Sequence, residues 1–316
     1  MDTVLDFLKE HDYFAIVTHL NPDGDAIGSA FALAQGLHNL GKQAKVVLLC
    51  KPPKKYDFEE FSHLYVLYEN RNEQKFEAIV SVDCATLQRL SKLKDFFGTK
   101  PNLNIDHHIS NTIFGQFNYV EDSPSTGEII YRILNELKVS FDHVIRMTIY
   151  MAMATDTGNF TYSNTTSKTL DIFAKLVKDG LEVTDLADKI FNKRTFASTK
   201  LIARFIDHIR LYKEDKLAIS VIMQKDFEET GAELEDCEIL IDYAREIDTV
   251  EIAVFVREMS ANTYKVSFRA NKYADVGDFA ARFGGGGHVK ASGCMMKGNL
   301  FDVLDTITKT AEDYLQ

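Results

Sequence analysis

Aspartate and histidine side chains recur in this sequence directly after apolar runs. An acid or a histidine is rarely stable at the end of a buried segment unless a charged or hydrogen-bonding group pairs with it. Mixed carboxylate and imidazole groups suit Mn²⁺, Fe²⁺, Zn²⁺ or Co²⁺. The pattern therefore predicts a metal centre to which several distant segments contribute. The candidate residues are His19, Asp23 and Asp25; Asp83; Asp106, His107 and His108; and Asp156.

Local roles could account for some of these residues one at a time. Asp25 stands at the position of an N-cap before helical periodicity that begins at Ala26, and Asp83 could cap a helix around 87–93. Two histidines in one loop also need no special function. These local roles leave ligand-type residues at three separate strand ends unexplained, so we favour one shared site.

Asp156 follows a different kind of element. Residues 143–154 are apolar on nearly every side, which predicts a buried helix. A carboxylate at the C-terminal end of a helix opposes the helix dipole, so Asp156 needs a cation or strong hydrogen-bond donors. Gly158, two residues later, is the glycine expected just after such a helix.

Strand segments are expected immediately before the other three groups, at 13–18, 76–82 and 103–105, with a further strand at 45–49. Helical segments lie between them, and this alternation predicts an α/β fold with a parallel, doubly wound sheet and helices on both faces. Sheets of this type bind ligands beyond the carboxyl ends of their strands. The acids and histidines should therefore meet at one edge of the sheet.

The chain of 316 residues is long enough for two cores. We expect a catalytic domain over 1–190, a connecting helix over 191–212, and a smaller α+β domain with a mixed sheet over 213–316. The active-site cleft is expected between the two domains. A run of four glycines, Gly284–Gly287, lies in the second of them.

The overall charge restricts the partners. A formal net charge of −11 argues against a protein that coats long duplex nucleic acid, but it permits a short anionic substrate in a local pocket. The four cysteines have no paired spacing and suggest reduced thiols in the cytoplasm. No run is apolar enough to span a bilayer, and no signal peptide is expected.

The glycine run is a second candidate site. Four successive glycines lose much backbone entropy on folding, and their bare N–H groups suit a phosphate. A flexible hinge is the alternative. His288 ends the run, and Arg269 leaves the strand expected at 264–268, where its guanidinium could fork onto a phosphate or simply be solvated.

These motifs together resemble the DHH phosphoesterase superfamily. The glycine run, followed by Ala291-Ser292-Gly293, is similar to the signature of the DHH-associated C-terminal domain. The order, spacing and length of the whole chain are most similar to the small bacterial nanoRNase and pAp-phosphatase branch. Each motif alone is weak, whereas the ordered set is specific. The N-terminal motifs are Asp23-Gly24-Asp25, Asp83, Asp106-His107-His108 and Asp156-Thr157-Gly158.

The resemblance implies two divalent ions, most often Mn²⁺. One ion would be held by His19, Asp23 and Asp83, and the other by Asp25, Asp83, His107 and Asp156, with Asp83 bridging. His108 would be catalytic and face the substrate phosphate. Asp106, also a catalytic candidate, would either orient a histidine or approach a metal. The substrate-binding residues would be Arg269, Gly285, Gly286, Gly287 and His288.

The expected activity is hydrolysis of short oligoribonucleotides to mononucleotides and of pAp to AMP, by a hydroxide activated between two ions. The alternatives are a phosphodiesterase for cyclic or linear dinucleotides, an inorganic pyrophosphatase, and a non-enzymatic nucleotide-binding regulatory module. The sequence does not decide whether the protein forms a homodimer.

Overall fold

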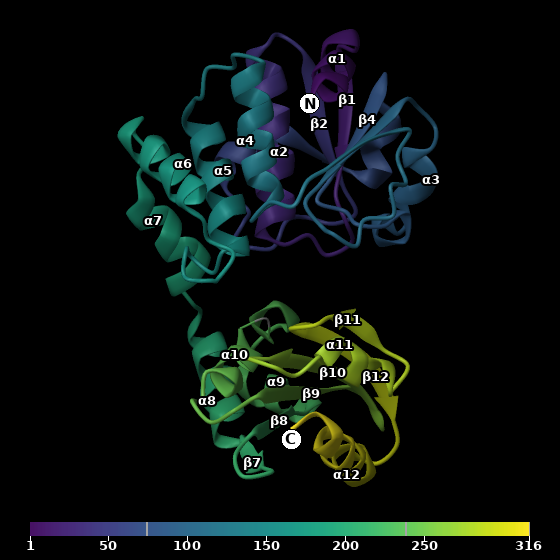
Figure 1. Ribbon diagram of the computed structural model, residues 1–316, viewed down its shortest axis with the longest axis vertical. Helices are drawn as coiled ribbons and strands as arrows, with labels where there is room; N and C mark the ends of the chain where they lie inside the picture. Colours follow the sequence, from purple (N-terminus) through teal and green to yellow (C-terminus); the bar gives the residue numbers. More distant parts are fainter. Residues whose placement is uncertain (74, 238, 316) are drawn as a thin grey trace. The chain divides into compact units, whose positions relative to one another are not determined.

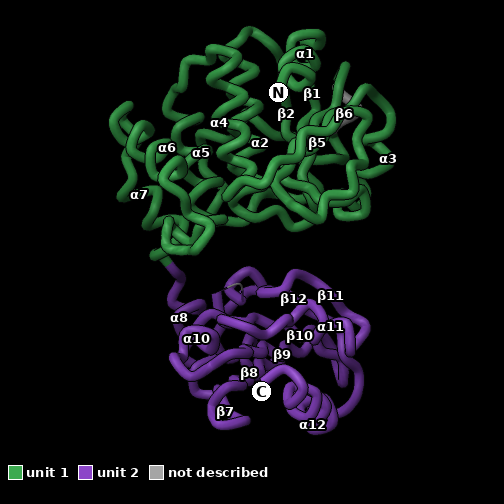
Figure 2. Tube along the Cα trace, viewed as in Figure 1, with its two compact units in different colours: residues 1–193 green, residues 194–316 purple. Residues whose placement is uncertain are grey.

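Two compact units make up the protein, Met1–Lys193 and Arg194–Gln316 (Figure 2). The computed structural model describes residues 1–73, 75–237 and 239–315. Each unit has its own six-stranded sheet and its own apolar core. The first sheet is parallel and the second is mixed, which confirms the predicted fold class.

The sheet of the first unit has the strand order β3-β2-β1-β4-β5-β6, and every neighbouring pair is parallel. Its central strands are almost wholly apolar and buried, as a sheet covered on both faces requires. The strand order reverses between β1 and β4, so the switch point of the sheet lies beyond their carboxyl ends. The strands are β1 (Tyr13–Val17), β2 (Gln43–Leu48), β3 (Tyr65–Leu67), β4 (Ala78–Val82), β5 (Asn102–Asp106) and β6 (Phe117–Val120).

Helices cover both faces of this sheet, as predicted, but unequally. Phe14 and Ile16 of β1 face the larger core, to which α1, α2, α4 and α5 contribute, whereas Ala15 and Val17 face a smaller one under η3 and α3. Figure 1 shows α2, α4 and α5 side by side on the larger face. The helices are α1 (Asp2–Glu10), α2 (Gly24–Asn39), η1 (Glu59–Leu64), η2 (Tyr68–Glu73), η3 (Leu87–Leu90), α3 (Leu93–Phe97), α4 (Thr126–Glu136), α5 (His143–Asp156), α6 (Ser167–Lys178), α7 (Val183–Ala187) and the π-helical turn η4 (Asp188–Asn192).

Glycines allow α2, α4 and α5 to approach each other closely. A Cβ atom on Gly28 of α2 would lie 2.5 Å from the carbonyl oxygen of Thr148 in α5. A Cβ atom on Gly127 of α4 would lie 2.4 Å from the Cβ of Ala152, also in α5. Contacts this short cannot be relieved by a side-chain rotation, because backbone or Cβ atoms form them. The three helices are therefore in near-backbone contact.

The second unit is built around the sheet order β11-β12-β10-β9-β8-β7, in which only the β8–β9 pair is parallel. The helix expected over 191–212 is shorter in the structure, because α8 ends at Asp207 and residues 210–212 form a strand. The elements are α8 (Phe196–Asp207), β7 (Arg210–Tyr212), β8 (Leu217–Ile222), α9 (Gln224–Thr230), η5 (Leu234–Cys237), α10 (Leu240–Arg245), β9 (Ile252–Ser260), β10 (Thr263–Ala270), α11 (Val276–Ala281), β11 (Gly286–His288), β12 (Ala291–Lys297), α12 (Leu300–Thr310) and η6 (Ala311–Tyr314).

In the described part of the chain, no helix combines the length and the apolar character that a bilayer crossing requires.

Candidate metal centre

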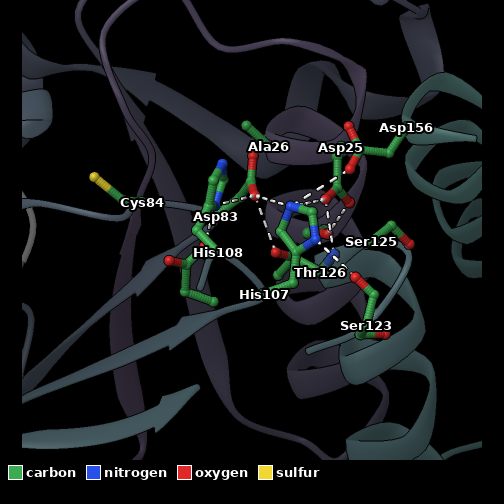
Figure 3. Close-up of polar contacts among 12 residues, drawn as sticks. Asp25, Ala26, Asp83, Cys84, His107, His108, Ser123, Ser125, Thr126 and Asp156 are labelled. Carbon is green, nitrogen blue, oxygen red and sulfur yellow. Dashed lines mark hydrogen bonds and ion pairs between the residues drawn. The ribbon is translucent and has the colours of Figure 1, made fainter. Parts of the chain in front are cut away.

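The strand ends of the first unit bring the predicted residues together, as the close-up in Figure 3 shows for most of them. His19 follows β1, Asp83 follows β4, and His107 follows β5, and these three strands are neighbours in the sheet. Asp25 lies in the first turn of α2, and Asp156 is the last residue of α5. Three strand ends and two helix ends thus converge at the switch point.

His19, Asp23 and Asp83 form one group that could hold a metal ion. The Nε2 atom of His19 lies 3.7 Å from Oδ2 of Asp83 and 3.9 Å from Oδ2 of Asp23. Its Nδ1 atom lies 2.9 Å from the carbonyl oxygen of Leu20, which can only accept, so Nδ1 carries the proton of the neutral ring. The buried Nε2 atom has no hydrogen-bond partner among the described residues. A lone pair that faces two carboxylates fits a divalent cation.

The carboxylates of this first group shift the pKa values of its members. Burial alone would lower the pKa of His19, but the neighbouring Asp83 and Asp23 outweigh it and raise that pKa. Partial desolvation by the surrounding protein, together with the charge of Asp83, raises the pKa of Asp23. Both shifts have the same physical meaning, because a proton stabilises the cluster where no cation does so.

Asp25, His107 and Asp156 form a second group that could hold an ion. The Nε2 atom of His107 lies 3.4 Å from Oδ2 of Asp156 and 3.8 Å from Oδ2 of Asp25. The Nδ1 atom of His107 donates to the carbonyl oxygen of Ser123 at 2.9 Å, which again leaves Nε2 for a ligand role. Burial raises the pKa of Asp156 to about 7 and that of Asp25 well above its usual range, and the charge of Asp83 contributes to both shifts.

Asp83 lies between the two groups. Its Oδ2 atom faces His19, whereas its Oδ1 atom lies 3.5 Å from Nε2 of His107 and accepts a 3.0 Å hydrogen bond from Oγ1 of Thr126. Burial would raise the pKa of Asp83, but His19, His107 and His108 outweigh it and lower that pKa to about 2. The φ angle of Asp83 is +53°, a left-handed conformation that Asp tolerates better than most residues. Asp83 does not cap the following helix, whose N-cap is Thr86.

The N-terminus of α4 holds the carboxylate of Asp25. The backbone N–H of Thr126 donates to Oδ2 at 2.7 Å, and that of Gly127 donates to Oδ1 at 2.9 Å. The hydroxyl of Ser29 donates to Oδ1 at 3.0 Å. These donors and the positive end of the helix dipole partly offset the cost of burying this carboxylate. The N-cap role expected of Asp25 belongs instead to Asp23, which accepts from the N–H of Ala26 at 3.0 Å.

Asp106 acts as a hydrogen-bond acceptor at the end of β5. Its fully buried carboxylate accepts from Nδ1 of His108 at 2.8 Å and from Nδ2 of Asn111 at 2.6 Å. Among the described residues, no metal-competent group includes Asp106. Burial alone would lower the pKa of His108, but Asp106 and Asp83 outweigh it and raise that pKa. Of the two roles left open for Asp106, the geometry supports the orientation of a histidine.

Three further residues shape this centre, and no distinctive sequence pattern marks them as part of it. Thr126 and Gly127 lie in a segment that signals a helix start, but the signal does not say that the helix would bind a carboxylate a hundred residues earlier. Asn111 donates to Asp106, to Oδ1 of Asn104 at 2.8 Å and to the carbonyl oxygen of Cys84 at 3.2 Å. No spacing rule singles out such an asparagine.

Arg89 is an exposed cation beside the first group. It lies in η3, and its carbonyl oxygen accepts a 2.8 Å hydrogen bond from the N–H of Leu20, the residue after His19. The charge of Arg89 is among the effects that oppose the rise in the pKa of Asp23. The same charge opposes the rise in the pKa of His108 that Asp106 causes. The positive charge of Arg89 therefore acts on the side chains at this edge of the sheet.

In the second unit, the predicted substrate residues lie on or next to two strands, β10 and β11, that flank β12 in the sheet. Gly286, Gly287 and His288 form β11, and both Arg269 of β10 and His288 pair with Ala291 of the intervening β12. Residues that pair across neighbouring strands point to the same face, so Arg269 and His288 share one row of the sheet. Gly285 precedes β11, where a Cβ atom would lie 2.3 Å from the carbonyl oxygen of Gly293.

A carboxylate and imidazole cluster at the switch point of a parallel sheet is typical of a metal-dependent hydrolase. Residues 13–155 match the DHH family, N-terminal domain, and residues 214–316 match the DHHA1 domain. The chain belongs to the DHH family, as its motifs predicted, and it is a metal-dependent phosphoesterase.

Relatives extend over most of the chain. The bifunctional oligoribonuclease and PAP phosphatase NrnA of Thermus thermophilus is 30% identical over 288 residues, which cover 90% of this chain and 84% of that protein. The NrnA of Bacillus subtilis is 28% identical over 292 residues, 90% of this chain and 89% of that protein. The crystal structure of an exopolyphosphatase-related protein from Bacteroides fragilis superposes with a TM-score of 0.92 at 25% identity, and covers 99% of this chain and 96% of that one.

Proposed function

We propose that this protein hydrolyses short oligoribonucleotides to mononucleotides and pAp to AMP, at a centre of two divalent ions. The observation that carries the proposal is the position of Asp83, whose two carboxylate oxygens face two separate metal-competent groups. The relatives named oligoribonuclease and PAP phosphatase support the choice of substrate. The net charge of −11 favours short substrates over long duplexes.

In this proposal, His19, Asp23 and Asp83 hold one ion, and Asp25, Asp83, His107 and Asp156 hold the other. Both histidines donate from Nδ1 to a carbonyl oxygen, which fixes the ring so that Nε2 points to the carboxylates. Two bound ions would supply an acidified water and neutralise charge on the phosphate. The carboxylate and imidazole donors suit Mn²⁺, the ion that we propose.

His108 is the proposed contact with the phosphate. Its Nδ1 donates to the buried carboxylate of Asp106, which Asn111 holds from the other side. This arrangement orients the ring and favours its protonated form, so that Nε2 can donate to a phosphate oxygen or to the leaving oxygen. Asp106 serves the reaction through His108 and does not itself contact the substrate.

The second unit is proposed to bind the substrate through Arg269, Gly285, Gly286, Gly287 and His288. The common row of Arg269 and His288 next to Ala291 supports this part of the proposal. The Arg269→Ala variant is expected to raise KM for pAp while kcat changes little, because a phosphate would lose a bidentate donor. An unchanged KM would remove Arg269 from the substrate site.

One experiment distinguishes the proposed function from its alternatives. The purified protein is incubated with Mn²⁺ and, separately, with a short RNA, pAp, a linear dinucleotide, a cyclic dinucleotide and pyrophosphate, and products are separated by chromatography. We expect mononucleotides from the short RNA and AMP from pAp. Turnover of pyrophosphate or of the cyclic dinucleotide alone would contradict the proposal. Tight nucleotide binding without any turnover would instead indicate a regulatory module.

A further inference from the structure

The turn that follows α5 carries a half-exposed tyrosine. Tyr162 is 49% exposed, and its ring lies against Gly158, where the φ angle is +55°. A Cβ atom on Gly158 would lie 2.2 Å from Cε1 and 2.4 Å from Cδ1 of the tyrosine ring. Only a glycine has both the backbone conformation and the bare surface for this contact. The backbone of Gly158 therefore supports the ring.

Hydrogen bonds within the turn fix the position of Tyr162. Its N–H donates to the carbonyl oxygen of Thr157 at 3.0 Å, and its carbonyl oxygen accepts from the N–H of Thr165 at 3.1 Å. The side-chain amide of Asn164 donates to the carbonyl oxygen of Asp156 at 3.1 Å and to that of Pro124 at 3.3 Å. The turn is thus tied to the metal centre at Asp156, and the ring is preorganised.

The cluster is open to solvent next to this turn. The side chain of Asp156 is 30% exposed, whereas those of Asp25 and Asp83 are almost fully buried. Gly158 is only two residues beyond Asp156, a distance of at most about 7 Å along the chain. The ring that covers Gly158 therefore lies within the reach of a nucleotide whose phosphate is at the metal centre.

The Tyr162 ring is not part of the apolar core of the first unit. Phe160, two residues earlier, stacks on Phe173 with ring centroids 4.6 Å apart and packs against the main core. In the described part of the chain, no aromatic partner of Tyr162 is found, and the ring belongs to none of the core clusters. A rigid aromatic ring that is half exposed beside a phosphate site is typical of a platform on which a base stacks.

We propose that Tyr162 is a stacking platform for the nucleobase next to the phosphate that is hydrolysed. This inference rests on the proposed function and deepens it, because it assigns nucleotide specificity to a side chain of the first unit. Stacking is tolerant of base identity, since every base has a π-face. The platform would therefore select nucleotides over other phosphate esters without selecting among the bases.

The test compares substrates with and without a base. KM and kcat are measured for pAp and for ribose 3′,5′-bisphosphate, which has the same phosphates but no adenine, with the wild type, Tyr162→Ala and Tyr162→Phe. Loss of stacking should raise KM for pAp about tenfold in Tyr162→Ala, leave KM for the bisphosphate unchanged, and leave Tyr162→Phe close to the wild type. Phe117→Ala, which removes an exposed ring at the amino end of β6, should change neither KM.

A second measurement does not depend on turnover. Calorimetric titration in Mn²⁺ with AMP and with ribose 5-phosphate should show that Tyr162→Ala weakens only the binding of AMP. An unchanged affinity for AMP, or an equal loss for both ligands, would overturn the platform. If the wild type hydrolyses no nucleotide, the proposed function fails, and the titration still decides the role of Tyr162. A thermal melt checks that each variant is folded.

Discussion

Three overlapping groups of the described first unit could hold an ion, and the third consists of Asp83, His107 and His108. The other two, the His19 group and the His107 group, differ in how firmly the protein holds their carboxylates. In the His19 group, the Asp23 side chain is 57% exposed and, among the described residues, accepts one hydrogen bond, from the N–H of Ala26. In the His107 group, the Asp25 side chain is 1% exposed and accepts three hydrogen bonds, two of them from the N-terminus of α4. We call the His19 group the open group and the His107 group the caged group, after the exposure and hydrogen bonding of these two carboxylates.

The difference concerns preorganisation. A caged carboxylate keeps its geometry whether or not an ion is present, so little conformational entropy is lost when the ion binds. An open carboxylate must be ordered by the ion itself. We therefore expect the open group to exchange its ion readily and to depend on metal concentration, and the caged group to depend more on protons.

Removal of the shared carboxylate should have the largest effect. Asp83→Ala takes a ligand from both groups, so kcat should fall by more than about a thousandfold and the number of bound ions per chain should drop. Rates at saturating Mn²⁺ and metal analysis of the dialysed protein measure these two effects. Circular dichroism should show a folded protein. Wild-type rates in this variant would show that Asp83 does not join the two groups.

Single substitutions in each group should separate the open site from the caged one. Asp23→Asn should raise the Mn²⁺ concentration for half-maximal activity by roughly 10–100-fold, and excess Mn²⁺ should restore the rate. Asp25→Asn should stay impaired at any Mn²⁺ concentration, because its amide group would oppose the N–H donors of Thr126 and Gly127. Full rescue of Asp25→Asn, or none of Asp23→Asn, would contradict the comparison.

Proton dependence should be stronger in the caged group than in the open one. Burial raises the pKa of Asp156 to about 7, so a proton competes with the ion below that pH. The apparent affinity for Mn²⁺ should then fall about tenfold per pH unit for each proton displaced. In the metal-free protein, the folded state binds more protons than the unfolded state between about pH 4 and 7. The free energy of unfolding should therefore decrease as pH rises through that range.

Two melting series check this prediction. Melting temperatures in EDTA should decline over that pH range, and Asp156→Asn should reduce the decline because it removes one of the titrating groups. The lowered pKa of Asp83 acts in the opposite direction, but only below about pH 4. A metal-free protein that grows more stable from pH 4 to 7 would refute the assignment.

The smallest effect should come from the positive charge beside the open group. Arg89→Ala removes a cation that acts on Asp23, so the affinity for Mn²⁺ should rise a few-fold at low salt, and less at high salt. Lys94→Ala, which removes an exposed cation from α3, is the matched control and should change nothing. Equal effects of both variants would point to net charge alone.

The sequence predicts the sheet and the positions of the ligand-type residues well, because both depend on local patterns. Apolar runs that end in an acid or a histidine mark the carboxyl ends of β1, β4 and β5, and helical periodicity marks α2 and α5. Parallel pairing then brings those ends to one edge. The assignment of ions to residues stays a prediction.

Other features depend on contacts that no local pattern encodes. Asp23 and Asp25 both satisfy the pattern of an N-cap, and only the distant N–H groups of α4 determine which of them is caged. The short edge strands β3 and β6 were not expected: β3 has three residues, in the apolar run Leu64–Tyr68 within an otherwise charged stretch, and β6 has four. Part of the glycine run forms β11 because it pairs with β12, and that pairing is not visible in four identical residues.

The glycine contacts between the helices have a consequence for ion choice. Asp25 and Asp156 lie at the ends of α2 and α5, whose separation is limited by Gly28, and Gly127 sets the approach of α4 in the same way. The distances between ligand oxygens are therefore determined partly by residues that touch no ion. Since ions of different radius need different oxygen spacings, drift in metal preference within such proteins can proceed through helix packing while every ligand is retained.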